Sequence, residues 1–254
     1  MPFTVSHAVI AHPISYLTGY RLPIAGLVIG SMAPDLYRLF TQEQSNLTHL
    51  WSSIFGITLW LGLGFSLLWY GLYRPVVYRC IGIQDPVILN TWKSAIKFIV
   101  LLIISLIIGI ATHLIWDGLT HADFRTFAFR EFLASTVQLF GQHYPMHRLL
   151  QLGSSALVLP LIAWSCLSYY RKFQQHLQVS RSIRYFRRGL VIVPFVAGLC
   201  AVLDYLRHLS SDLIRSDLYY FTGRMINEFS QTALIVFSLG CLLFLFLDRN
   251  HRLG

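Results

Sequence analysis

The sequence predicts an all-α integral membrane protein, a polytopic helical bundle of about five transmembrane helices with short interfacial helices at its N-terminal end. Of its 254 residues, 55% are hydrophobic and only 12% are charged, whereas a soluble domain usually carries about 25% charged residues. The apolar residues fall in long blocks, which are typical of helices that cross a bilayer. The polar segments between these blocks are short, so we expect a single membrane domain over residues 1–254.

An N-terminal cap of short helices is expected over residues 1–51, which are mixed in polarity. The segment from Ile24 to Met32 is apolar but shorter than the roughly 20 residues that cross a bilayer. Pro34 suits the first turn of a further helix that continues to Phe40. The first residues lack the basic region, apolar core and small-residue cleavage site of a signal peptide, so we expect the start of the chain to be retained.

Five apolar segments follow, and we predict that each crosses the membrane as an α-helix. They lie near residues 52–73, 96–116, 152–170, 189–206 and 232–247. A polar connection separates the second segment from the third, and a mixed-charge loop separates the fourth from the fifth.

The distribution of basic residues predicts the orientation of these spans. Counting Lys97, the segments after the first, third and fifth spans hold 12 of the 20 Lys and Arg residues, which leaves 8 for the opposite side. Because Lys and Arg accumulate in cytoplasmic loops, we expect the N-terminus outside the cell and the C-terminus in the cytoplasm.

A stripe of metal-ligating residue types ends the second predicted span. His113, Asp117 and His121 are spaced four apart, and residues four apart lie on the same face of an α-helix. Imidazole and carboxylate are the usual ligands of zinc and of other divalent transition metals. Ionisable groups at membrane depth are costly and tend to be functional, so we expect a metal site here.

The predicted topology brings further ligand types to the same membrane face. Residues before the first span and after the second both lie outside, although they are distant in sequence. The candidate ligands are His7, Asp35, His49, His113, Asp117, His121, His143 and His147. Pro145 prevents a regular helix through the last two histidines, so their side chains are not assumed to share a face.

These residue types also have other roles in proteins. A lone histidine near a helix end is more often an interfacial, hydrogen-bonded residue than a ligand. No Gly-x-Ser-x-Gly elbow indicates a serine nucleophile, and only the second span has a histidine in its interior, which disfavours a haem clamp between helices. The four cysteines include no Cys-x-x-Cys pair.

The net charge of +9 does not predict a nucleic-acid-binding protein. The Lys and Arg residues gather beside apolar blocks, without the aromatic-basic interleaving of a strand-binding surface. Anchoring of the spans and attraction to anionic headgroups explain these positions. We therefore expect membrane lipids as partners and no nucleic acid.

Three sequence motifs are distinctive: Met1-Pro-Phe-Thr-Val-Ser-His7, Leu27-Val-Ile-Gly-Ser-Met-Ala-Pro-Asp35 and Thr112-His-Leu-Ile-Trp-Asp-Gly-Leu-Thr-His121. Together with the segment from His147 to Ser155, they resemble the bacterial membrane family labelled domain of unknown function 4184. The resemblance covers essentially the whole chain and implies a protein of the bacterial cytoplasmic membrane. It brings no established activity with it.

The order of the candidate ligands is also similar, more distantly, to that in the zinc-dependent phospholipase C and P1 nuclease group, and in predicted membrane-bound metal-dependent hydrolases. Asp35 and His49 are fourteen positions apart, about the spacing found in zinc phospholipases. The resemblance implies that ligand positions are matched by Asp35, His49, His113, Asp117 and His121, with His7 as an addition.

The chain departs from that group at two points. The later His-x-x-x-Glu motif would fall at His143 and His147, where His replaces Glu and Pro145 intervenes. The N-terminal tryptophan whose amine is a ligand in that group has no counterpart. These departures put a third metal in doubt.

The leading hypothesis is a membrane-bound divalent-metal-dependent hydrolase whose site lies at the outer membrane face. Zinc is the first choice because the ligand types are His and Asp without Cys, and manganese is the second. Asp117 could bridge two ions, and Asp35 could act as a ligand or as a catalytic base. A lipid phosphoester is the expected substrate. The alternatives are a non-catalytic scaffold or lipid-binding protein with a structural metal or none and, ranked lower, a transporter.

Overall fold

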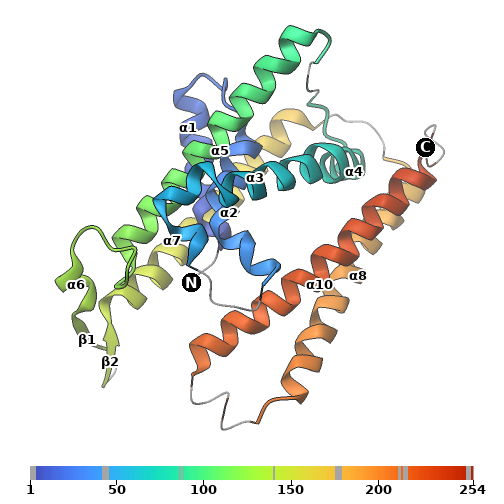
Figure 1. The fold of residues 1–254 in the computed structure, drawn as a ribbon. Coiled ribbons are helices and arrows are strands. Elements are labelled where there is room, and N and C mark those ends of the chain that lie inside the picture. The colour runs from blue at the N-terminus through green and yellow to red at the C-terminus, as the bar shows by residue number, and fades with distance from the viewer. Residues whose placement is uncertain are drawn as a thin grey trace. The chain divides into compact units, whose positions relative to one another are not determined.

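The computed structural model describes residues 4–41, 46–85, 87, 89–139, 141–174, 179–210, 213, 217–249 and 253. Helices dominate this part of the chain (Figure 1). Four of them are long and apolar enough to cross a membrane: α5 (Trp92–Thr120), α7 (Met146–Phe173), α8 (Arg181–Arg207) and α10 (Leu218–Leu247). The prediction of an all-α membrane protein is confirmed.

The first predicted span, residues 52–73, is divided among several helical segments. The 3₁₀ helix η4 (Trp51–Phe55) covers its start, α3 (Ile57–Leu68) its middle, and a π-helical segment (Trp69–Tyr73) its end. Helix α4 (Arg74–Ile81) follows directly. Helix α3 alone has 12 residues, fewer than the roughly 20 that a membrane-spanning helix needs.

Contacts divide the chain into two compact units. The first unit comprises Met1–Ser66 and Pro86–Lys172, and the second comprises Leu67–Asp85 and Phe173–Gly254. All the candidate ligands belong to the first unit.

The first unit is built on the packing of α2 (Ile24–Leu36) along α5 (Figure 1). The two helices approach closely because each has a glycine at the crossing. A Cβ atom on Gly30 would collide with the backbone of Leu106, and one on Gly109 would lie 2.6 Å from the carbonyl oxygen of Leu27. Side chains larger than hydrogen at these two positions would therefore separate the helices.

Helix α2 continues through Pro34, so the prediction that this proline starts a new helix is wrong. Pro34 lies in the last turn of α2, where its missing N–H removes only the hydrogen bond to the residue four before it. A short 3₁₀ helix, η2 (Tyr37–Leu39), follows. The remaining short elements before α3 are η1 (Thr4–Ile10), α1 (Ala11–Leu17) and η3 (Leu47–His49).

The polar connection after α5 contains structure that the sequence did not predict. It holds a short helix, α6 (Arg130–Ala134), and an antiparallel hairpin of β1 (Thr136–Leu139) and β2 (Gln142–Pro145). Thr136 pairs with Pro145 and Leu139 with Gln142. Gly141 has a φ of 80°, a conformation that glycine adopts without steric cost, and it allows the tight turn.

In the second unit, α8 and α10 pack side by side (Figure 1), and α4 contributes to the same core. Phe244 is fully buried, and Val76 and Ile183 pack in the same cluster. Close contact of the two long helices depends on Gly198, where a Cβ atom would lie 2.6 Å from the ring of Phe229.

Candidate metal centre

His113 and Asp117 project from the last turns of α5 into the interior of the first unit. They are 0% and 1% exposed. The Nδ1 atom of His113 lies 2.8 Å from the carbonyl oxygen of Ser31 on α2. Because a carbonyl only accepts hydrogen bonds, Nδ1 carries the proton, and in the neutral ring Nε2 presents its lone pair to the interior.

Asp35 and His49 bring two further segments to the same place. Asp35 lies at the end of α2 and His49 at the end of η3, and both side chains are buried. The Nε2 atom of His49 is 3.2 Å from Oδ1 of Asp35 and 3.6 Å from Oδ2 of Asp117. Burial alone would raise the pKa of Asp35, but His113 and the hydrogen bond with His49 hold it well below its usual value.

His7, from η1, completes the cluster. Its ring stacks on that of His113 with centroids 4.0 Å apart, and its Nε2 is 3.9 Å from Oδ1 of Asp117. Burial lowers the pKa of His7 to about 4, so the imidazole is neutral at neutral pH. Neutral imidazole is the form that binds a metal.

The arrangement of these atoms fits a divalent metal ion. The residues form two groups, and within each group the ligand atoms lie within 4.8 Å of one another: His7, Asp35 and His113 in one, and His49, His113 and Asp117 in the other. Tetrahedral ligands at the usual zinc distance are about 3.3 Å apart, which is close to several of these separations. We call the five residues the His/Asp cluster.

Two buried atoms of the cluster have no hydrogen-bond partner among the described residues: Oδ2 of Asp35 and Nε2 of His113. A buried polar atom without a partner is costly, and its presence calls for an explanation. Both atoms are of types that coordinate divalent metals. A metal ion between them would satisfy both.

His121 lies beside the cluster, against Asp117. Its Nδ1 is 3.1 Å from the carbonyl oxygen of Asp117, to which it donates, and 3.5 Å from the carboxylate atom Oδ1. Burial lowers the pKa of His121 to about 4. No ligand group found among the described residues includes His121.

The hairpin histidines are not brought into the cluster. His143 is exposed on β2. His147 lies in the first turn of α7, and its Nδ1 donates to the carbonyl oxygen of Leu133 at 3.2 Å. Neither belongs to a ligand group in the described part of the chain.

Arg125 is a site residue that no sequence motif predicted. Its Nη1 donates to Oδ2 of Asp117 at 2.9 Å, and its Nε donates to both carboxylate oxygens of Asp123. The sequence signal was an acidic and a basic residue two apart directly after the His121 stripe. This signal is weak because most such pairs are solvated.

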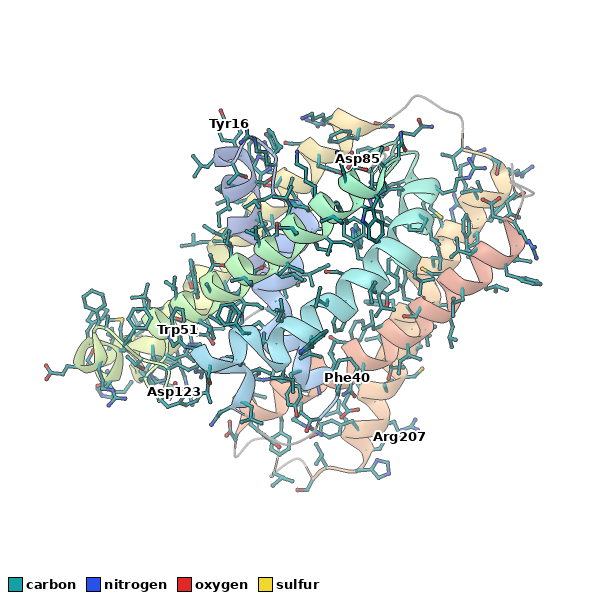
Figure 2. The ribbon with its side chains drawn as sticks, turned by 45° about the horizontal axis from the view of Figure 1, so that its top comes forward. Tyr16, Phe40, Trp51, Asp85, Asp123 and Arg207 are labelled. Atoms are coloured by element: carbon teal, nitrogen blue, oxygen red, sulfur yellow. The ribbon has the colours of Figure 1, made fainter. Side chains whose placement is uncertain are left out.

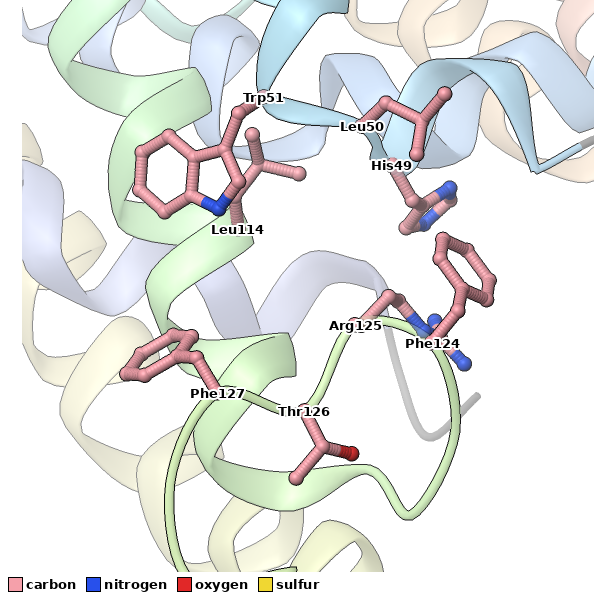
Figure 3. Close-up of a pocket in the computed structure, with 8 residues that line it drawn as sticks. All are labelled: His49, Leu50, Trp51, Leu114, Phe124, Arg125, Thr126 and Phe127. Atoms are coloured by element: carbon pink, nitrogen blue, oxygen red, sulfur yellow. The ribbon is translucent and has the colours of Figure 1, made fainter.

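A pocket of about 190 Å³ adjoins the cluster. Figure 3 shows the His49 ring and the Arg125 guanidinium on one side of it, with Trp51, Leu114 and Phe127 opposite. Trp51 and Asp123 lie at the same end of the first unit (Figure 2). The pocket therefore combines an apolar wall with polar groups shared with the cluster.

Fold and site together define an integral membrane protein with a buried His/Asp cluster at the end of α5, the most apolar of the four candidate spans. A family model described as Domain of unknown function (DUF4184) matches residues 1–247. The chain belongs to this family, which confirms the resemblance indicated by its motifs. No curated protein matches the chain. No solved structure matches it either.

Proposed function

We propose that the protein is a divalent-metal-dependent hydrolase that cleaves a phosphoester in a lipid headgroup at the outer face of the bacterial cytoplasmic membrane. The observation that carries this proposal is the His/Asp cluster, which is buried, contains two unpartnered atoms of ligand type and adjoins a pocket. A purely structural network of buried polar groups would be expected to satisfy its own hydrogen bonds.

The residues that would hold the metal are His7, Asp35, His49, His113 and Asp117. Zinc suits this donor set best, and manganese second. A divalent ion bound there would supply a Lewis acid and lower the pKa of a bound water molecule.

The chain's own residues have distinct roles in this proposal. Asp35 would hold the metal through its unpartnered Oδ2, and its lowered pKa keeps it in the ionised form that coordinates a cation. Arg125 would hold Asp117 in place through their 2.9 Å contact and face the developing negative charge. In the reaction, a bond forms between phosphorus and the water oxygen, the bond to the leaving alcohol breaks, and a proton ends on that alcohol.

A second candidate function is a membrane scaffold in which the metal only ties segments together. The observation in its favour is that the ligands come from four elements, η1, α2, η3 and α5, and that His113 and Asp117 are almost completely buried. Structural metal sites are closed by protein ligands, whereas catalytic sites keep one position open. The pocket beside the cluster favours the hydrolase.

The first test is the metal content of the full-length protein, purified in detergent without chelator and resupplied with zinc or manganese. We expect a stoichiometric metal in the wild type and its loss in His113→Ala and Asp117→Asn. His143→Ala is the matched control, because this histidine is exposed and lies outside the cluster, and it should keep the metal.

Activity is then measured on lipid phosphoesters and on a small water-soluble phosphodiester. Metal-dependent release of the alcohol, abolished in the two cluster variants and kept in the control, is the expected result. Metal without turnover of any phosphoester would favour the scaffold. A wild-type protein that binds no metal would contradict both proposals.

A further inference from the structure

The pocket beside the His/Asp cluster has a lining that is polar at one side and apolar elsewhere. His49 and Arg125 are its polar contributors near the cluster, and Thr126 adds a hydroxyl. Leucine and aromatic side chains form the rest of the wall: Leu50, Trp51, Leu114, Phe124 and Phe127. Such a lining fits a ligand with a charged end and an apolar end.

Arg125 has hydrogen-bonding capacity left for a ligand. A guanidinium has five N–H donors. Among the described residues, its contacts with Asp117 and Asp123 involve Nη1, Nε and Nη2, which occupies one N–H on each nitrogen. The side chain is 13% exposed, and it lines the pocket, so two N–H groups remain for an anion.

The charge balance specifies when an anion can enter. Asp35, Asp117 and Asp123 carry three negative charges, Arg125 carries one positive charge, and Arg38 adds a second near Asp35, so the site alone is negative and would repel phosphate. A divalent ion makes the sum positive. Anion binding therefore rests on the metal of the proposed function.

The size of the pocket limits what enters with the phosphate. Its volume of about 190 Å³ is below the roughly 300–1,000 Å³ of pockets that enclose a drug-sized ligand. A phosphate with a few adjoining carbons would fill it. Trp51, Phe124 and Phe127 are each about half exposed at the rim, where aromatic rings favour the membrane–water interface.

We infer that this pocket is the subsite for a phosphate anion carrying a small apolar group, as at the glycerol end of a phospholipid, and that Arg125 is its recognition residue. The phosphate faces the His/Asp cluster, and the adjoining carbons contact Trp51 and Phe127. The longer acyl chains pass the aromatic rim into the bilayer.

Binding to the metal-loaded, detergent-solubilised full chain tests this assignment. The probes are a short-chain phospholipid phosphonate, which is not hydrolysed, inorganic phosphate, and a neutral glyceride with the same chains. We expect the phosphonate to bind at least about tenfold more tightly than inorganic phosphate or the glyceride, because only the phosphonate has both the anionic group and the apolar chains.

Two variants test separately how the anionic end and the apolar end of the ligand are recognised. Arg125→Gln should weaken the phosphonate and phosphate about 10- to 100-fold. Trp51→Ala should weaken the phosphonate about three- to tenfold and leave phosphate unchanged. The matched controls are Arg130→Gln, an exposed arginine on the same connection, and Trp60→Ala, an exposed tryptophan that does not line the pocket.

Metal content is measured in every variant, because Arg125 also contacts Asp117. If the Arg125→Gln variant loses the metal, the Trp51→Ala variant still tests the pocket assignment, since Trp51 is not in the cluster. A Trp51→Ala variant that binds the phosphonate as tightly as the wild type overturns the assignment.

The failure of this assignment differs from a failure of the hydrolase proposal. Metal-dependent cleavage of a small phosphodiester, with the phosphonate bound no better than phosphate, overturns the pocket assignment alone. Phosphonate binding that depends on Arg125 and Trp51, without turnover of any phosphoester, overturns the hydrolase alone and supports the pocket.

Discussion

Single hydrogen bonds orient the imidazoles of the His/Asp cluster. His113 donates from Nδ1 to the Ser31 carbonyl, and Nδ1 of His49 lies 3.2 Å from the hydroxyl of Thr48. The Thr48 hydroxyl can accept or donate a hydrogen bond. It can therefore pair with Nδ1 of His49 both when Nε2 contacts Asp35 and when Nε2 binds a metal. Such outer partners fix the tautomer and raise metal affinity.

Thr48→Val should therefore lower the affinity for zinc about 10- to 100-fold, because it removes the hydroxyl while keeping the shape of the side chain. Affinity is measured by competition with a chromogenic chelator. Thr48→Ser should restore it. Thr112→Val is the control, since the Thr112 hydroxyl donates to the Gly109 carbonyl and contacts no cluster residue. Equal affinities for Thr48→Val and Thr112→Val would contradict this role.

At the scale of elements, the site depends on the close crossing of α2 and α5. Gly109 lies one turn before His113, and the atoms nearest to an added Cβ at this position belong to Leu27, Gly30 and Ser31. The same contact region carries the hydrogen bond from His113 to Ser31. The distance between the two helices and the geometry of the candidate ligands are thus set together.

Gly109→Ala should destabilise the protein by about 1–3 kcal/mol, since the added methyl overpacks the crossing. It should also reduce metal binding, because α2 carries Asp35. Thermal unfolding in detergent and metal content are the measurements. Gly64→Ala on α3 is the control: its Cβ would meet nothing within 4 Å, so it should be neutral or stabilise by up to about 1 kcal/mol. Equal melting temperatures of the two variants would refute the crossing argument.

The sequence predicted the long helices and the pairing of His113 with Asp117, because both follow from short-range patterns. Apolar blocks identified the long helices, and the four-residue spacing placed His113 and Asp117 on one face. The contacts of Ser31 and Arg125 could not be predicted, because they depend on how closely α2 approaches α5 and on the conformation of the loop after His121. The hairpin at 136–145 was missed because its strands have only four residues each.

At the scale of the whole molecule, the cluster constrains the path of the chain. His49 contacts Asp117 near one end of α5, while Trp92 begins α5 at the other end, about 38 Å away at 1.5 Å per residue. If α5 spans the bilayer, the chain between His49 and Trp92 must cross it as well. This agrees with five crossings, although α3 alone is too short to count as a span.

The proposed orientation can be tested by thiol labelling of intact spheroplasts, in a chain whose four cysteines are replaced by alanine. His143→Cys should react with a membrane-impermeant reagent added outside, because the hairpin lies on the side of the cluster. Arg184→Cys, in the basic segment, should react only after the membrane is opened. The reverse pattern would place the site in the cytoplasm, and labelling of both from outside would contradict the topology.

The long sequence separation between contacting residues has a consequence for biosynthesis. Ser31 and His113 are 82 residues apart, so the segments that carry His7, Asp35 and His49 are synthesised well before α5 exists. These early ligands have no complete site to join until α5 has been made and inserted. Under the proposed function, metal capture would therefore be a late event in assembly, and a nascent chain truncated before His113 should bind no metal at this site.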